Sequence, residues 1–302
     1  MQPTSFIWMN GEFVPWSEAK VHVMTYALHY GGGVFEGMRV YKTAHGPAVF
    51  RLREHIERLF YSAQVLHLKI PYSVEQLCDA TCELLRRNNL EHGYIRPLAF
   101  YGYGVMGLNP SAGPTDMMLA CWPWGPYISV EQADIKVSKY IRIHPRSTVA
   151  DAKICGHYAN SILAVLELQG TKYHEALFLD ADGLVAEGPG ENFFIVRDNQ
   201  LITPPLGTIL PGITRATVLE IARTMGISTS EHPITLDDAL SADEAFFTGT
   251  AAEVTPIATI NDQRIGAPGV GALTKRLKIA YDDIVHGRDE RHLHFLTFVQ
   301  PR

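Results

Sequence analysis

The chain has 302 residues, 46% hydrophobic and 19% charged, a composition that can form a full apolar core, most simply in two domains. Its net charge of -6 is spread without a basic block, which argues against nucleic acid as a partner. No apolar run approaches the ~18 residues of a membrane span, and residues 1–10 lack the pattern of a signal peptide, so we expect no membrane association and a cytoplasmic location.

The first predicted elements are a hairpin and a glycine-rich stretch. Asn10-Gly11 lies inside residues 7–14, and this dipeptide between short apolar runs predicts two strands joined by a tight turn. Further along, Gly31–Gly33 removes side chains where the backbone turns sharply or where something approaches it closely. Phe35 and Arg39 follow at once, so this stretch is either a flexible loop or a functional one.

Helices and strands alternate through the rest of the first half. The apolar spacing predicts strands over residues 47–52, 94–101 and 117–122 and helices over 53–66 and 74–88. Arg58 lies on the first of these helices beside its apolar face. Arg96 is a charge in an otherwise apolar strand, where it needs solvent or a partner, which makes it a candidate anion contact.

Residues 102–107 match the dinucleotide pattern G-x-G-x-x-G after a predicted strand. In nucleotide-binding folds this pattern opens a helix whose N-terminus holds the pyrophosphate. Here Asn109-Pro110 follows, which is typical of a turn. An NAD-dependent oxidoreductase therefore has little support, and a loop that packs over something is the better interpretation.

A stiff connector divides the chain. Residues 123–127 combine proline, glycine and aromatic residues directly after a predicted strand, and we place the domain boundary there. The predicted organisation is a small domain over 1–123, a linker over 124–133 and a large domain over 134–302.

The second half is expected to be richer in strands. Strands are predicted over residues 135–143, 175–180, 192–196, 200–203 and 244–248, and helices over 159–169, 216–225 and 270–285. Asp182-Gly183 and Asn199 supply turns. Thr214 can cap the helix that follows Pro211-Gly212, and Thr248-Gly249-Thr250 ends a strand in a turn with hydroxyl and amide donors.

Cysteine and histidine patterns indicate no metal site. The four cysteines contain no CxxC pair and are expected to be reduced thiols. The thirteen histidines show no metal-binding spacing.

Lys153 is the residue around which a reaction can be built. It lies among small residues at a loop-to-helix junction, where a desolvated amine loses its proton more readily than in water. Glu187 follows 34 positions later in a glycine-rich turn. A lysine for a Schiff base, an acid for a ring nitrogen and donors for a phosphate are the groups that pyridoxal phosphate requires. A non-catalytic binding protein would leave this lysine without a role.

At these positions the sequence resembles the branched-chain amino-acid aminotransferases, which are fold-type IV pyridoxal-phosphate enzymes. The resemblance covers nearly the whole chain and is most specific at residues 29–31, 34–39, 94–97, 152–158, 187–192, 211–215 and 249–253. It implies a mixed α/β (α+β) fold with a small α/β domain and a larger pseudo-barrel β domain flanked by helices.

The resemblance also implies a role for each site residue. Lys153 is expected to form the Schiff base and to shuttle the proton, with Glu187 at the pyridine nitrogen and Tyr158 at the phenolic oxygen. The phosphate ligands implied are Arg58, Ile213, Thr214 and Thr250. The substrate carboxylate would be bound by Tyr94, Thr250 and Ala251, supported by Arg39. The apolar pocket would be walled by Tyr30, Phe35, Trp124, Tyr127 and Leu108, the last from a neighbouring subunit.

The implied reaction is ping-pong transamination between L-leucine, L-isoleucine or L-valine and 2-oxoglutarate. Arg96 would pair with the γ-carboxylate of glutamate at the rim of the same pocket. A site completed by a neighbour's loop implies a homodimer or a higher homo-oligomer such as a hexamer. The alternatives are a D-amino-acid or (R)-amine transaminase or an aminodeoxychorismate lyase, and Gly32-Gly33 and residues 154–157 differ from the common pattern near the pocket.

Overall fold

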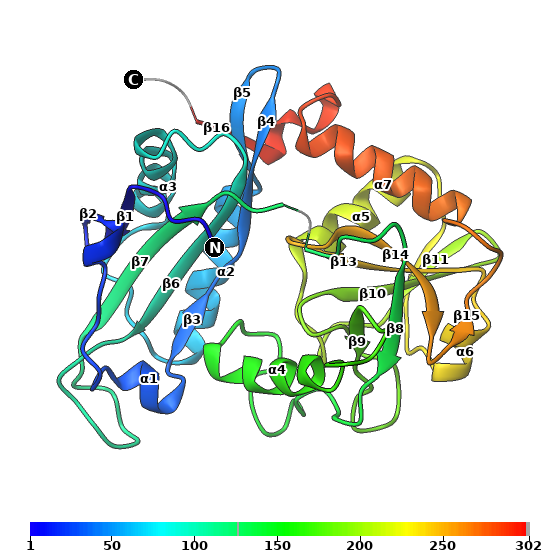
Figure 1. The fold of residues 1–302 in the computed structure, drawn as a ribbon, viewed down its shortest axis with the longest axis horizontal. Coiled ribbons are helices and arrows are strands. Elements are labelled where there is room, and N and C mark those ends of the chain that lie inside the picture. Colours follow the sequence, from blue (N-terminus) through cyan, green and yellow to red (C-terminus); the bar gives the residue numbers. More distant parts are fainter. Residues whose placement is uncertain (126, 300–302) are drawn as a thin grey trace. The chain divides into compact units, whose positions relative to one another are not determined.

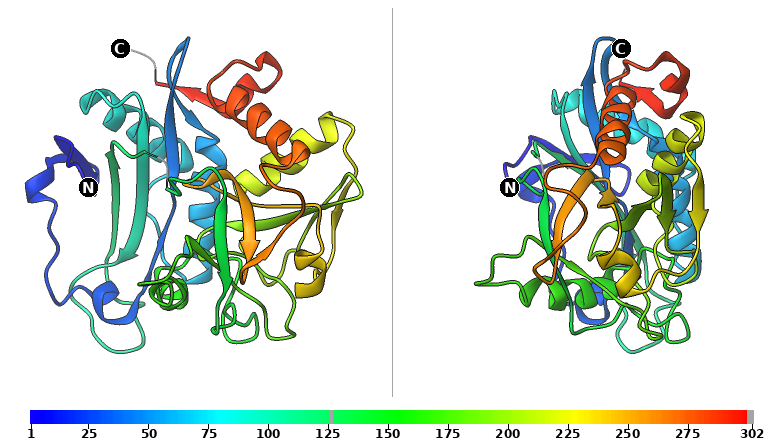
Figure 2. Two further views of the ribbon diagram at one scale, coloured as in Figure 1. Left: turned by 45° about the vertical axis from the view of Figure 1, so that its right-hand side comes forward. Right: turned by 90° about the vertical axis from the view of Figure 1, so that its right-hand side faces the viewer.

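The structure, a computed structural model, describes residues 1–125 and 127–299. Contacts group the chain into two units (Figures 1 and 2). Unit 1 comprises Met1–Gly125, Ala152–Gly156 and Ile284–Arg302, and unit 2 comprises Pro126–Asp151 and His157–Asp283.

The two units differ from the predicted domains in two segments. Residues 152–156 and 284–299, predicted in the large domain, group with unit 1. Residue 126 of the predicted linker and residues 300–302 of the predicted large domain lie outside the described residues. The boundaries 1–123, 124–133 and 134–302 stay a prediction.

Unit 1 is built on an eight-stranded sheet with the order β16-β5-β4-β6-β7-β1-β2, with β3 paired to β6. Its strands are β1 (Phe6–Met9), β2 (Glu12–Pro15), β3 (Gly33–Phe35), β4 (Met38–Thr43), β5 (Gly46–Phe50), β6 (Gly93–Tyr101), β7 (Thr115–Trp122) and β16 (Leu296–Phe298). Its helices are η1 (Trp16–Glu18), α1 (Tyr26–Tyr30), α2 (Leu52–Val65), α3 (Val74–Arg87) and η3 (Glu290–Phe295). Helices α2 and α3 pack on each other and on one face of the sheet (Figure 1).

Local chemistry explains several of these elements. Asn10 and Gly11 adopt positive φ angles of 51° and 97° in the turn of the β1–β2 hairpin, as a tight hairpin requires. Ser73 accepts a hydrogen bond from the Gln76 amide while the Gln76 side chain accepts from the Ser73 amide, and this capping box starts α3. The predicted hairpin and both predicted helices of this unit are confirmed.

Unit 2 is built on a second eight-stranded sheet, with the order β12-β11-β10-β13-β14-β8-β9 and β15 paired to β14. Its strands are β8 (Ala133–Val137), β9 (Glu175–Leu177), β10 (Asn192–Arg197), β11 (Gln200–Thr203), β12 (Thr229–Glu231), β13 (Glu244–Gly249), β14 (Glu253–Ile260) and β15 (Gln263–Arg264). The remaining helices are η2 (Cys155–His157), α4 (Tyr158–Leu166), α5 (Ile213–Thr224), α6 (Leu236–Leu240) and α7 (Ala272–Val285). The mixed α/β class is confirmed.

Two predicted strands of unit 2 are shorter than expected. The strand predicted over 135–143 ends at Val137, where its pairing with β9 reaches Leu177, and beyond it the Arg142 amide makes a separate hydrogen bond to the Leu179 carbonyl. Around the predicted Asp182-Gly183 turn, pairing is reduced to the isolated bridge between Leu179 and Val185. The turn itself is present, with the Gly183 amide donating to the Asp180 carbonyl.

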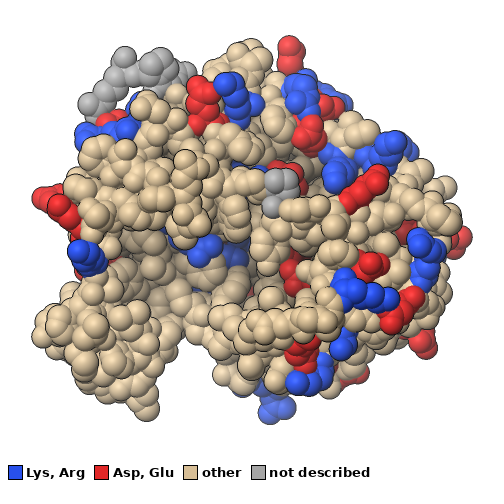
Figure 3. Space-filling view, in the orientation of Figure 1, with Lys and Arg blue, Asp and Glu red and all other residues tan. Residues whose placement is uncertain are grey.

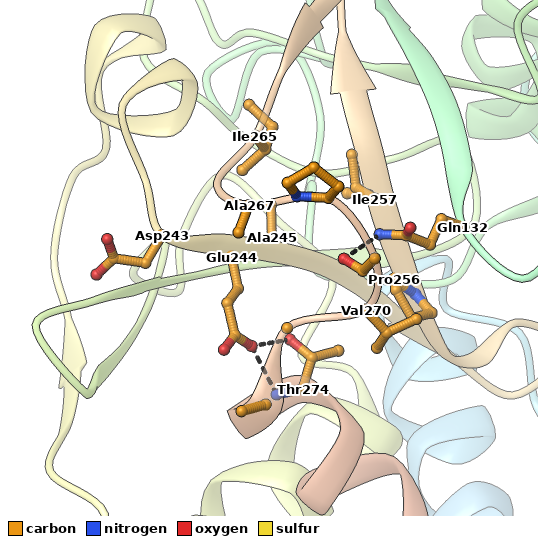
Figure 4. Close-up of a pocket in the computed structure, with 14 residues that line it drawn as sticks. Gln132, Asp243, Glu244, Ala245, Pro256, Ile257, Ile265, Ala267, Val270 and Thr274 are labelled. Atoms are coloured by element: carbon orange, nitrogen blue, oxygen red, sulfur yellow. Dashed lines mark hydrogen bonds between the residues drawn. The ribbon is translucent and has the colours of Figure 1, made fainter.

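The N-terminus of α7 is anchored to β13 by Glu244 (Figure 4). Its carboxylate accepts hydrogen bonds from the amides of Leu273 and Thr274 at 3.0 and 2.7 Å and from the Thr274 hydroxyl at 2.6 Å. A small pocket of about 220 Å³ adjoins this cap, and Gln132 crosses it to donate to the Gly269 carbonyl. None of the predicted site residues lines this pocket.

Within the part of the chain that the structure describes, no helix has the length and apolar character needed to cross a membrane. The same residues contain no group of three or more His, Cys, Asp or Glu side chains arranged to hold a metal ion.

Candidate active site

Lys153 lies in unit 1. It belongs to the short segment Ala152–Gly156, which comes from the second half of the chain but groups with unit 1. The Lys153 amide donates to the hydroxyl of Ser62 at 2.9 Å, and the Lys153 carbonyl accepts from the Phe35 amide at 3.2 Å. The half-buried lysine side chain extends over Phe35, with Nζ 5.0 Å from the ring centroid. The main chain of this lysine is therefore fixed while its amine lies against an aromatic wall.

The segment from Phe35 to Gly37 brings several predicted residues together. The guanidinium carbon of Arg96 is 4.7 Å from the Phe35 ring centroid and 5.3 Å from that of Tyr94. Arg96 Nη2 also donates to the Tyr94 hydroxyl at 3.2 Å. A side chain at Gly37 would overlap the Tyr94 hydroxyl, which explains the glycine at this position. Lys153, Phe35, Tyr94 and Arg96 thus form one cluster.

Arg58 is held by a buried acid that the sequence analysis did not assign to the site. Glu36 is fully buried, and its carboxylate accepts from Arg58 Nε at 2.6 Å, from Arg58 Nη2 at 2.9 Å and from His55 Nδ1 at 2.8 Å. Burial alone would raise the pKa of Glu36, but the Arg58 and His55 contacts outweigh it and hold that pKa well below its usual range. The sequence signal that could have identified Glu36 is its position, as an acid between Phe35 and Gly37 in the glycine-rich stretch.

Burial acts on His55 in the opposite sense to the contact with Glu36. Burial lowers the pKa of His55, and the hydrogen bond to Glu36 opposes this only in part. A neutral His55 can donate from Nδ1 to Glu36 without adding a charge. The positive Arg58 and the negative Glu36 then balance each other, which lowers the cost of burying both ions.

Two further predicted residues of unit 1 lie beside this cluster. Trp124 packs edge-on against Tyr94, with ring centroids 4.6 Å apart. Arg39 is buried and donates from Nη2 to the Gly125 carbonyl at 2.7 Å, so it anchors the backbone that follows Trp124.

Tyr30 and Leu108 differ from these residues because their side chains are exposed. Tyr30 is 43% exposed at the end of α1, and Leu108 is 87% exposed in the loop after β6. That loop continues into turn structure and not into a helix, as predicted for residues 102–110.

In unit 2, Glu187 is the centre of a buried polar network. Its carboxylate accepts from Arg142 Nε at 2.6 Å, from Asn192 Nδ2 at 3.0 Å and from the Leu210 amide at 3.2 Å. A carboxylate offers about four lone-pair positions, so these contacts still leave acceptor capacity. Arg142 and Asn192 were not predicted in this role, because nothing in their local sequence marks partners 45 and five residues away.

The N-terminus of α5 corrects one prediction. The helix begins at Ile213, three residues earlier than expected, and its N-cap is Gly212, with no side-chain capping hydrogen bond. Thr214 is therefore not the cap but a buried residue of the first turn. Because no side chain caps the helix, its first amides remain available to an anion. A side chain at Gly212 would overlap Asn192 Oδ1, so only glycine fits there.

The other predicted residues of unit 2 lie on turns or at a helix start. Thr250 and Ala251 form the turn that joins β13 to β14, and Tyr158 is the first residue of α4. Tyr127 is 41% exposed and its hydroxyl contacts the buried Glu175.

Comparison with known proteins places this geometry in a family. Residues 33–260 match the family described as amino-transferase class IV. The chain belongs to this family. The branched-chain-amino-acid aminotransferase of Pseudomonas aeruginosa is 46% identical over 97% of both chains, and that of Escherichia coli is 42% identical over 94% of both.

Solved structures of branched-chain aminotransferases have the same fold. The enzyme of the thermophilic archaeon Thermoproteus uzoniensis, solved with norvaline, is 42% identical and superimposes with a TM-score of 0.95 over 98% of this chain and 100% of that one. The enzyme of Thermobaculum terrenum, solved in its PLP-form, is 35% identical, with a TM-score of 0.93 over 100% of both chains. The predicted membership of the branched-chain aminotransferases and the predicted fold type are thereby confirmed.

Proposed function

We propose that this class IV aminotransferase uses pyridoxal phosphate to transfer the amino group of L-leucine, L-isoleucine or L-valine to 2-oxoglutarate in a ping-pong reaction. The observation that carries the proposal is the way in which Lys153 is positioned. Its main chain is hydrogen-bonded on both sides and its amine lies beside Phe35 and Arg96, in a chain whose relatives are branched-chain-amino-acid aminotransferases over nearly their full length.

The donor set fits this cofactor. The α5 N-terminus lacks a side-chain cap, Arg58 is oriented by Glu36, and Glu187 is a buried carboxylate with remaining acceptor capacity. On the strand beside Asn192, Thr248 is buried and its hydroxyl has no hydrogen-bond partner among the described residues. A buried polar atom without a partner is rare unless a ligand or water completes it.

Each predicted residue receives a role in this proposal. Bound pyridoxal phosphate supplies an aldehyde that condenses with amines and a ring that withdraws electrons from the substrate. Lys153 would hold the cofactor and move a proton at Nζ, Glu187 would hold the ring nitrogen, and Tyr158 would donate to the phenolic oxygen. The phosphate would be bound by Arg58, Ile213, Thr214 and Thr250, and the substrate carboxylate by Tyr94, Thr250 and Ala251 with support from Arg39.

Arg96 would allow one pocket to accept two kinds of side chain. Its guanidinium lies over Phe35 and next to the Tyr94 hydroxyl, at the aromatic wall proposed to bind leucine. A γ-carboxylate can form a bidentate pair with a guanidinium, while an aliphatic side chain contacts the rings without using that charge. Tyr30, Phe35, Trp124, Tyr127 and, from a second subunit, Leu108 would complete the apolar wall.

The cofactor is tested with purified protein. We expect it to be yellow, and borohydride should fix the cofactor to the peptide that contains Lys153. A Lys153→Ala variant serves as the matched control and should retain no fixed cofactor. A colourless protein that does not change on addition of pyridoxal phosphate would refute the proposal.

The substrate is tested by comparing amino donors with 2-oxoglutarate as acceptor. L-leucine should react faster than D-alanine or (R)-phenylethylamine, and preference for either of the latter would assign the chain to a D-amino-acid or (R)-amine transaminase. Arg96→Leu should impair the reaction with glutamate much more than with leucine. Arg53→Leu, which removes an exposed arginine from α2, should impair neither. Equal losses with both substrates in Arg96→Leu would contradict the dual role.

We also propose that the enzyme is a homodimer or a higher homo-oligomer located in the cytoplasm. Residues 21–35 and 97–115 contain no charged residue, and this part of unit 1 exposes Val23, Leu28, Tyr103, Met106 and Leu108. Figure 3 shows no charged side chain over α1 and the loop after β6 on this face, whereas charges of both signs alternate over unit 2.

A contiguous uncharged apolar surface of this kind is typical of a protein contact. Light scattering after gel filtration should show two or more chains per particle. Leu108→Asp should shift that mass toward the mass of a single chain. If the parent protein itself has the mass of a single chain, the proposal is contradicted. The cytoplasmic location is supported by four free cysteines, which are typical of a reducing compartment.

A further inference from the structure

Helix α2 buries a stripe of polar side chains where a core helix usually places apolar ones. His55, Arg58 and Ser62 follow one another at spacings of three and four residues and so lie on one face of the helix. His55 and Ser62 are 2% and 0% exposed, and the Arg58 side chain is 11% exposed. Burying polar groups costs stability unless each finds a hydrogen-bond partner, so these three require an explanation.

The partners of this polar stripe lie outside the helix. His55 and Arg58 share Glu36, as described above. Ser62 accepts a hydrogen bond from the backbone amide of Lys153, which is 91 residues away in the sequence. The serine hydroxyl therefore binds the backbone of the segment that contains the proposed catalytic lysine.

The segment around Lys153 is attached to the rest of unit 1 by main-chain contacts and by the packing of Ala152 and Ile154 in its core. The Lys153 carbonyl accepts from the Phe35 amide, and Ile154 forms an isolated bridge with Val34. The contact from the Lys153 amide to Ser62 is made by a side chain, whereas the contact from the Lys153 carbonyl to Phe35 is made by the backbone. The contact to Ser62 can therefore be removed by a single substitution without changing the backbone of either partner.

We propose that Ser62 is a positioning residue that seats Lys153 at a set distance from Arg58. The two α2 residues are four positions apart, which corresponds to about 6 Å along the helix axis. One rigid helix would thus hold both Arg58, which is proposed to bind the phosphate, and Ser62, which positions the lysine proposed to bind the aldehyde. The proposal rests on the proposed role of Lys153, because a lysine without a reaction would need no such alignment.

The first test uses the apoprotein and does not depend on activity. In Ser62→Ala the Lys153 amide loses its acceptor, and hydrogen–deuterium exchange at that amide should become about tenfold faster, as expected for one buried hydrogen bond. Ser62→Cys keeps the branching of the side chain but offers a weak acceptor, and it should behave like Ser62→Ala. The matched control is Thr81→Val, which removes a buried hydroxyl of α3 that bonds only within its helix. This control should leave exchange at Lys153 unchanged.

The second test uses the holoenzyme. Ser62→Ala should lower kcat for L-leucine by about tenfold with little change in KM, because alignment of the amine matters in the reacting geometry. Borohydride fixation at Lys153 should slow in the same variant. A purely structural serine would lower the urea midpoint in Ser62→Ala and Thr81→Val alike, with parental exchange at Lys153 and parental kcat. That result, or parental exchange in Ser62→Cys, would overturn the proposal.

The two tests separate this proposal from the proposed function. If the parent protein binds no pyridoxal phosphate, the proposed function fails, while the exchange measurement still reports whether Ser62 holds Lys153. If the parent is an active transaminase and the exchange rate at the Lys153 amide equals the parental rate in Ser62→Ala, Ser62→Cys and Thr81→Val, only the role of Ser62 fails.

Discussion

Replacing Glu36 by glutamine tests how Arg58, the arginine proposed to bind the phosphate, is held in place. Three bonds of 2.6 to 2.9 Å reach the Glu36 carboxylate, two from Arg58 and one from His55. Removing one partner of a buried ion pair costs about 3–5 kcal/mol, because the other charge is left without compensation. Glutamine keeps the shape and one acceptor, so we expect the lower end, about 3 kcal/mol, in urea unfolding at pH 7.

The loss should depend on pH in a defined direction. The pKa of Glu36 is lowered in the folded state, so its stabilisation is complete above the unfolded value of about 4.3 and is lost as the pH falls further. The difference in stability between the parent and Glu36→Gln should therefore be constant above about pH 5.3, one unit above that unfolded value, and should shrink in more acidic buffer.

The same variant should bind the cofactor less well through its phosphate. Glu36→Gln should weaken the affinity of the apoprotein for pyridoxal phosphate by about tenfold or more, the scale of one charge-assisted contact, and change that for pyridoxal much less. The matched control is Glu83→Gln, whose partners Arg86 and Arg87 are 29% and 42% exposed and which should lose under about 1 kcal/mol. Parental stability at pH 7 together with equal losses for the two ligands would refute this reasoning.

Three further changes have defined outcomes. Burial raises the pKa of Glu175 to about 7, so the parent loses up to about 3 kcal/mol as the pH rises from 4.5 to 7, and Glu175→Gln should abolish this slope in urea unfolding. Gly37→Ala should displace the Tyr94 hydroxyl and raise KM for leucine and glutamate alike, by about tenfold, whereas a change for one substrate alone would contradict a shared carboxylate site. Glu244→Ala should lower stability by about 1–2 kcal/mol through loss of the α7 cap, and an unchanged melting temperature would contradict that role.

Local sequence signals predicted local structure well. The Asn10-Gly11 hairpin and the helix around Arg58 depend on neighbours within a few residues, and both are present. The start of α5 was misplaced because Thr214 is a good capping residue, whereas the backbone after Pro211 already enters the helix at Ile213. Capping statistics alone do not separate these alternatives.

Contacts between distant residues could not be predicted in the same way. Arg142 reaches Glu187 from 45 positions away, and Ser62 reaches Lys153 from 91. Each of these residues is ordinary in its own sequence context, and only the fold brings the partners together. Family resemblance identified the residues proposed to touch ligands, whereas the residues that hold them in place are seen only in the folded structure.

The position of β16 affects how this chain folds during synthesis. Residues Leu296–Phe298 pair with β5, so an edge of the first sheet is completed by a segment that leaves the ribosome after all of unit 2. Until then β5 presents unpaired backbone groups, a template for pairing with another nascent chain. Chains truncated before residue 296 should therefore associate more readily than full-length chains, even though they retain every residue proposed to touch a ligand.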